Sequence, residues 1–218
     1  MKQIIIISII AGLITIFLFL NQNNSFKNSF PKISTQADKD RDNINDIEDI
    51  LAWARQEVKN KTVYKDGYFS EGFPPDGQWV CTDVIWRAFK NAWYDIKKMI
   101  DEDIQKNTSD YPRVAWKPEP NIDFRRVPNL ESYLQKYAHN LPIEIIPNNF
   151  QNLNSWQAWD IIIFWKPKDH IAIISDKRNQ NWVPYIIHNG WPVAKENDML
   201  LYWHENISPI IWHYRIKY

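Results

Sequence analysis

The sequence predicts an α+β fold, in which N-terminal helices pack on a C-terminal antiparallel β-sheet. Between residues 46 and 138, apolar residues recur every three or four positions, which is the period of amphipathic helices. After Pro142 the pattern changes to short β-branched and aromatic runs separated by Asn, Pro, Lys and Asp. Helices come first and strands afterwards, so the elements do not alternate as in a doubly wound sheet.

The N-terminal residues 1–21 are predicted to form a signal peptide or a membrane anchor. Lys2 precedes a run without charges from Ile4 to Leu20, about as long as a short membrane span. No pair of small residues follows as a cleavage site, which favours an uncleaved anchor. With Lys2 on the cytoplasmic side, the rest of the chain is exported. We therefore expect an exported protein, either anchored in the membrane by this segment or released from it after cleavage.

The next segment, residues 22–45, is polar and has too little apolar content to pack, so it is predicted to be a linker. The folded domain is then expected over residues 46–218. Its first helix is predicted at "DIEDILAWARQEVKNK" and its second, longer helix from Cys81 to Ile100. A third helix follows "EPNIDFRRVP", with Asn129 as its candidate N-cap. Strands are expected at "IEII", "DIIIFW", "HIAIIS", "VPYIIH" and "IIWHYRI".

The charge balance argues against a nucleic-acid partner. Lys plus Arg number 26, as do Asp plus Glu, and no basic block is present. No close pair of ligand residues at a typical metal spacing, such as Cys-x-x-Cys, occurs either. We expect no metal and no cofactor.

The chain has one cysteine, Cys81, in the first turn of the second predicted helix. A single thiol makes no internal disulfide, and in an oxidising compartment it is either buried or used. A helix N-terminus lowers a thiol pKa by less than one unit, because its effect is roughly 0.3–1 kcal/mol. A nucleophilic cysteine therefore also needs an imidazole nearby.

Two of the five histidines lie where they could serve it. His170 opens the strand "HIAIIS", and His188 closes the strand "VPYIIH". If these strands pair as a hairpin, both imidazoles end near one edge of the sheet. One would be the general base and the other would orient it, with Asn189 as a rival for the orienting role.

The segments "GQWVCTDVIWRAF", "WDIIIFW", "DHIAIIS" and "IIHNG" resemble the bacterial YijF-like family of domains of unknown function (DUF1287). That family is similar in turn to the papain-like NlpC/P60 cysteine peptidases of the cell wall. The resemblance covers residues 46–218 and implies an NlpC/P60-type fold with Cys81 as nucleophile, His170 as base and His188 as third residue. It also implies a tyrosine upstream of the nucleophile as oxyanion donor, for which Tyr68 is the candidate and Tyr64 the alternative.

Three charged residues are candidates for substrate binding. Arg125 and Arg126 in "NIDFRR" suit carboxylates of a peptide, although an Asp/Arg bridge that holds this loop fits the sequence equally well. Asp83, in the first helical turn, either joins them or caps backbone N–H groups.

Taken together, these features predict an exported cysteine hydrolase of peptide or amide bonds in cell-wall peptidoglycan, acting on peptides or muropeptides. Two alternatives remain open. One is a non-catalytic module that binds cell-wall fragments in the same cleft, and the other is an acyl transferase that passes the acyl group to an amine.

Overall fold

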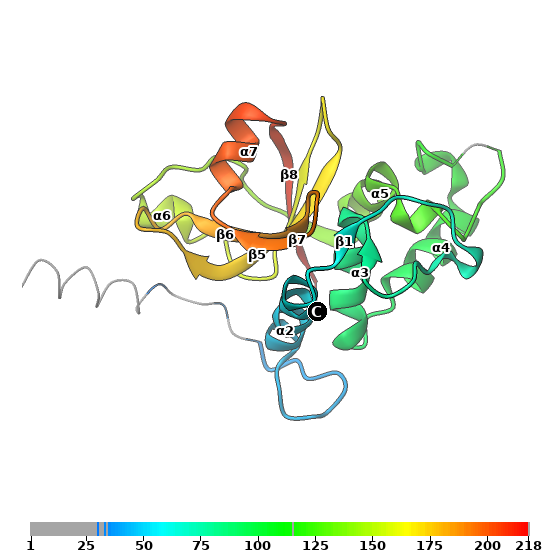
Figure 1. Cartoon of the computed structure of the whole chain (residues 1–218), viewed down its shortest axis with the longest axis horizontal. Coiled ribbons are helices and arrows are strands. Elements are labelled where there is room, and N and C mark those ends of the chain that lie inside the picture. Colours follow the sequence, from blue (N-terminus) through cyan, green and yellow to red (C-terminus); the bar gives the residue numbers. More distant parts are fainter. Residues whose placement is uncertain (1–29, 31–32, 34, 115, 218) are drawn as a thin grey trace, which may run out of the picture. The chain divides into compact units, whose positions relative to one another are not determined.

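The computed structural model describes residues 30, 33, 35–114 and 116–217, which form an α+β domain with an antiparallel sheet (Figure 1). Its compact unit runs from Ile33 to Tyr218, so residues 33–45 of the predicted linker belong to it. The predicted anchor or signal segment, residues 1–21, lies outside the described residues. Among the residues that are described, no helix is both long and apolar enough to cross a membrane.

Most of the helical structure comes before the sheet, as predicted. Figure 1 shows the helices of the first half gathered beside the strands of the second half. The helices are α2 (Asp46–Lys59), α3 (Cys81–Asn91), α4 (Ile96–Lys106), α5 (Val127–Tyr137), α6 (Phe150–Leu153) and α7 (Leu200–Asn206), with 3-10 turns at Ser70–Gly72, Thr108–Asp110 and Asp123–Arg125.

A six-stranded antiparallel sheet forms the second half, in the order β3-β8-β4-β5-β6-β7. Its strands are β3 (Ala138–Asn140), β4 (Ile161–Phe164), β5 (His170–Arg178), β6 (Pro184–Asn189), β7 (Ala194–Asn197) and β8 (Ile210–Ile216). Before α3, the short strands β1 (Val63–Tyr64) and β2 (Gln78–Trp79) pair in parallel.

Several local predictions were wrong. The second helix does not continue to Ile100, because Trp93 adopts a left-handed conformation (φ 61°) and Asp95 then caps a separate helix α4. Asn129 lies inside α5 and is not its N-cap; its side chain instead bonds the backbone of Asp123 and Arg113.

Two strand predictions also failed. The segment "IEII", residues 143–146, is not a strand and is mostly exposed. Strand β7, "AKEN", was not expected because it has neither β-branched nor aromatic residues.

Helix α3 is positioned by its packing against the sheet. Val84, Ile85, Ala88 and Phe89 are each 1% exposed and belong to one core cluster with residues of β4 and β5. Each large apolar side chain buried in this way contributes about 1.5–3 kcal/mol. The packing fixes the first residue of the helix, Cys81, against β5.

Candidate active site

A pocket of about 340 Å³ opens where β5 begins and β6 ends. It is lined by Tyr64, Lys168, Asp169, His170, Gly190, Trp191 and Trp203. Trp191 is 71% exposed and forms part of its rim. The pocket therefore combines an imidazole, a phenol and two charged side chains with aromatic walls.

Cys81 lies beside this pocket at the N-terminus of α3. The side chain is 6% exposed, and its sulfur lies at the backbone N–H of Ile171, the residue after His170. The charge of the thiolate also acts on the hydroxyl of Tyr64. The first residue of the helix and the second residue of the strand are thus neighbours in space, although they are far apart in the chain.

His170 and His188 are brought together by the predicted hairpin. Strands β5 and β6 pair antiparallel, with Ile173 opposite Ile187. His170 Nε2 lies 2.8 Å from His188 Nδ1, and the two ring planes are 79° apart. Both side chains are buried, at 4% and 3% exposed. The contact is the geometry of a base held by a second group.

Trp203 and Gly190 hold the histidine pair in place. The Trp203 ring, on α7, stacks on the His170 ring with centroids 4.4 Å apart and planes 16° apart. A Cβ atom on Gly190 would lie 2.7 Å from both Nδ1 and Cε1 of His188 and 3.2 Å from the Trp203 ring. Residue 190 is therefore glycine because no side chain fits between these rings.

Burial keeps all three groups neutral. Desolvation raises the pKa of Cys81 to about 12, and the N–H of Ile171 opposes this only in part. Desolvation lowers the pKa of His170 well below 6.5, with smaller contributions from His188 and Lys168. It also lowers the pKa of His188 to about 4. At neutral pH the site thus rests as a thiol with two neutral imidazoles.

One tautomer assignment satisfies this arrangement. If His170 donates from Nε2 to Nδ1 of His188, then Nδ1 of His170 keeps its lone pair and His188 carries its proton on Nε2. That buried Nε2 has no close hydrogen-bond partner among the described side chains, and neither has Oδ1 of Asn197. An interaction with Asn197 nevertheless raises the His188 pKa, in opposition to burial. Asn197 is therefore the group toward which this proton is directed.

Asp83 and Arg125 form a buried ion pair. The Arg125 guanidinium donates to both Asp83 oxygens, at 2.7 and 2.9 Å, and to the Gly67 carbonyl. Asp83 also accepts from the Val80 N–H and from Trp86 Nε1. These bonds leave neither side chain free for a substrate, and they favour the capping and loop-holding alternatives.

Arg126 lies in the same loop and is partly exposed. It pairs with Asp123 at 2.9 Å and donates to the carbonyl of Arg113. This Asp/Arg bridge is the loop-holding contact that the sequence left open.

The predicted oxyanion and orienting candidates are placed differently from expectation. Tyr68 is 58% exposed and bonds Glu119 and Asn121, whereas Tyr64 lines the pocket. Asn189 donates to the carbonyls of Thr62 and Trp79, so it holds the loop before α3. The group bonded to His170 is His188, not its rival Asn189.

Sequence reasoning missed Trp203, Gly190 and Asn197. Trp203 lies in a short helix with no motif around it, and nothing in the sequence links it to His170. Gly190 directly follows the strand that carries His188. Because the chain has only five glycines, a glycine at this position could have indicated that the backbone lies close to His188.

Comparison with known proteins places this geometry in context. The family described as "Domain of unknown function (DUF1287)" matches residues 51–216. "Uncharacterized protein YijF" of Escherichia coli (strain K12) is 33% identical over 176 residues, covering 76% of this chain and 80% of that protein. The crystal structure of an N-acetylmuramoyl-L-alanine amidase from Bacteroides uniformis is similar with a TM-score of 0.45 and 11% identity, covering 79% of this chain and 99% of that one.

Proposed function

This chain belongs to the DUF1287 family, as its motifs predicted, and we propose that its pocket is the active site of a cysteine hydrolase of peptide or amide bonds. One observation carries the proposal. His170 and His188 are buried with their nitrogens 2.8 Å apart, and the backbone N–H of Ile171, the residue after His170, lies at the helix-terminal thiol of Cys81. A papain-like arrangement of nucleophile, base and orienting group accounts for these contacts.

The reaction starts from neutral groups. The Cys81 sulfur attacks the substrate carbonyl carbon while its proton passes to Nδ1 of His170. The high thiol pKa and the low imidazole pKa disfavour a preformed ion pair, so proton transfer accompanies attack. The imidazolium then protonates the leaving amine, and the acyl group stays on sulfur. Water, deprotonated by His170, hydrolyses this thioester and restores the thiol.

Negative charge on the substrate oxygen needs hydrogen-bond donors. The Cys81 backbone N–H is one, because the first N–H groups of a helix have no partner within the helix. We assign the second to the Tyr64 hydroxyl. Burial, followed by the smaller effect of the Cys81 charge, raises the pKa of the Tyr64 hydroxyl to about 12. The hydroxyl therefore keeps its proton at neutral pH and can donate a hydrogen bond to the substrate oxygen.

We propose cell-wall peptides as the substrate class and the bacterial envelope as the location. Support comes from the apolar run at residues 4–20, which favours export, and from the resemblance of the motifs to NlpC/P60 peptidases. Charged rim residues Lys168 and Asp169 suit a peptide with both amino and carboxylate groups.

The test is hydrolysis of muropeptides by the purified chain, followed by chromatography and mass spectrometry of the products. We expect Cys81→Ala to abolish product formation. His139→Ala, which removes an exposed histidine on β3, is the matched control and should keep full activity. Equal turnover by the parent and Cys81→Ala would rule out the cysteine mechanism.

A second candidate function, a non-catalytic module that binds cell-wall fragments, is favoured by the raised pKa of Cys81. A thiol with a pKa of about 12 is almost entirely protonated at neutral pH. If the chain is a binding module, a muropeptide should bind equally well to the parent and to Cys81→Ala, and neither protein should form a product. Product amides formed only when an amine acceptor is added would instead identify acyl transfer.

A further inference from the structure

The segment before α2 carries aspartates at a spacing that the proposed hydrolase does not use. In "DKDRDNINDIED", residues 38–49, they occupy positions 1, 3, 5, 9 and 12. Calcium loops of the EF-hand type place oxygen ligands at positions 1, 3, 5, 7, 9 and 12, with a carboxylate at position 12. The segment therefore has a carboxylate at five of these positions, with Asn43 at position 6 and Asp49 at position 12 in place of the usual Gly and Glu.

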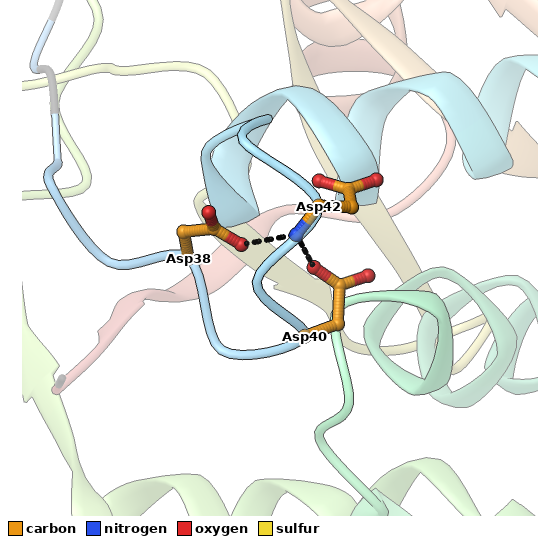
Figure 2. Close-up of side chains that lie close together, drawn as sticks. All are labelled: Asp38, Asp40 and Asp42. Carbon is orange, nitrogen blue, oxygen red and sulfur yellow. Dashed lines mark hydrogen bonds between the residues drawn. The ribbon is translucent and has the colours of Figure 1, made fainter.

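The first three carboxylates converge in the structure. Figure 2 shows the carboxylates of Asp38 and Asp40 directed toward the backbone N–H of Asp42, and one oxygen of each of the three aspartates lies within 4.8 Å of the others. Oxygens bound to one calcium ion lie at most about 5 Å apart, twice the Ca–O distance of 2.3–2.6 Å. The cluster thus has the dimensions of a calcium shell.

The backbone of the loop turns as a calcium loop requires. The Asp42 N–H donates to Asp38 at 3.1 Å and to Asp40 at 3.3 Å, and the Asn43 N–H donates to Asp38 at 2.9 Å. Asn43 has φ 72°, in the left-handed region. It stands at position 6, where EF-hand loops use glycine for a sharp turn, and asparagine tolerates that conformation.

Asp49, at position 12, gives independent evidence for a ligand. It lies in the first turn of α2 and is 5% exposed, and its buried Oδ2 atom has no hydrogen-bond partner among the residues that the structure describes. The negative charges of Asp42, Asp40, Asp46 and Asp38 all act on this carboxylate. A buried carboxylate oxygen that has no hydrogen-bond donor and is repelled by other carboxylates lacks a cation.

We propose that residues 38–49 bind one calcium ion through Asp38, Asp40, Asp42 and Asp49, with the Ile44 carbonyl at position 7. Oxygen-only ligands suit calcium, magnesium or manganese, and the spacing selects calcium. This revises the sequence-based expectation of no metal.

Asp46, at position 9, already accepts the Lys39 N–H at 2.9 Å and the Tyr94 hydroxyl at 2.7 Å. It therefore contributes through a water, as position 9 often does. Because Lys39 lies within the loop and Tyr94 lies between α3 and α4, Asp46 also ties the ion-binding segment to the helices. The bound ion would fasten residues 38–45 to the start of α2.

The experiment is calorimetric titration of the full-length chain, in mild detergent and freed of metal with chelator, with Ca²⁺ and separately with Mg²⁺. We expect one Ca²⁺ per chain with a dissociation constant below about 1 mM, weaker Mg²⁺ binding, and a thermal midpoint raised by calcium. No binding by the folded chain, or equal affinity for both ions, would overturn the proposal.

Two isosteric variants and one control assign the ligands. Asp40→Asn and Asp49→Asn should weaken Ca²⁺ binding about tenfold or more. Asp66→Asn changes an exposed aspartate in another loop and should bind as the parent does. Asp49→Asn should also melt at or above the parent's temperature without calcium, because it replaces a buried carboxylate oxygen that has no donor among the described residues. Unchanged calcium binding in Asp49→Asn would refute the assigned site.

Discussion

Replacing His188 by glutamine should remove a large part of the acid sensitivity of the fold. The folded protein holds the pKa of His188 at about 4, against an ordinary value of 6.5. Because the folded pKa is lowered, the unfolded chain binds the proton more tightly, and stability is lost as the pH falls below 6.5 toward 4. With 1.36 kcal/mol for each pKa unit, the loss from this residue is about 3 kcal/mol. Glutamine does not titrate, so the variant should not show it.

The assay is urea unfolding of residues 33–218, followed by tryptophan fluorescence, at several pH values between 4 and 7. The free energy of unfolding of the parent should fall by about 3 kcal/mol more than that of His188→Gln over this range. The substitution also removes the smaller effect of His188 on the pKa of His170, which acts in the same direction. Parallel curves for the two proteins would refute the buried, neutral state assigned to His188.

Three further predictions concern the pocket. Gly190→Ala should displace His188, whose Nδ1 lies 2.7 Å from the added Cβ, and cost about 1–3 kcal/mol by overpacking; an unchanged urea midpoint would contradict this. Tyr64→Phe should lower the rate of muropeptide hydrolysis about tenfold or more while Tyr68→Phe leaves it unchanged, and equal rates in the two variants would remove the assigned oxyanion donor. Alkylation of Cys81 should accelerate steadily as the pH rises above 8, since its pKa is about 12; a rate plateau below pH 7 would show a preformed ion pair instead.

The catalytic candidates were predictable because each stands at the end of a regular element. A helix that begins at Cys81 and a hairpin that joins His170 to His188 follow from periodicity and from strand order. The choice between Tyr64 and Tyr68 was not predictable, because Tyr64 ends the two-residue strand β1 and Tyr68 lies in the irregular loop that follows. Its path is fixed by bonds to distant residues such as Asn189.

The composition of residues 22–45 did not predict the ordered loop before α2. Averaged over residues 22–45, the polar content indicates a linker, whereas the ordered loop depends on the spacing of individual aspartates. The break between α3 and α4 was missed for a related reason. The apolar period continues through Trp93 and Asp95, but a residue with positive φ and a new N-cap end one helix and start another.

The ion pair between Asp83 and Arg125 sets an order of assembly for the nascent protein. Asp83 leaves the ribosome 42 residues before Arg125. Until Arg125 has been synthesised, burying the start of α3 would leave the Asp83 carboxylate without its positively charged partner, which costs several kcal/mol. The helix that presents Cys81 therefore docks only after the segment around Arg125 has been made, and the thiol meets His170 later still. During synthesis, the candidate site can form only after Arg125, His170, His188 and finally Trp203 have been made.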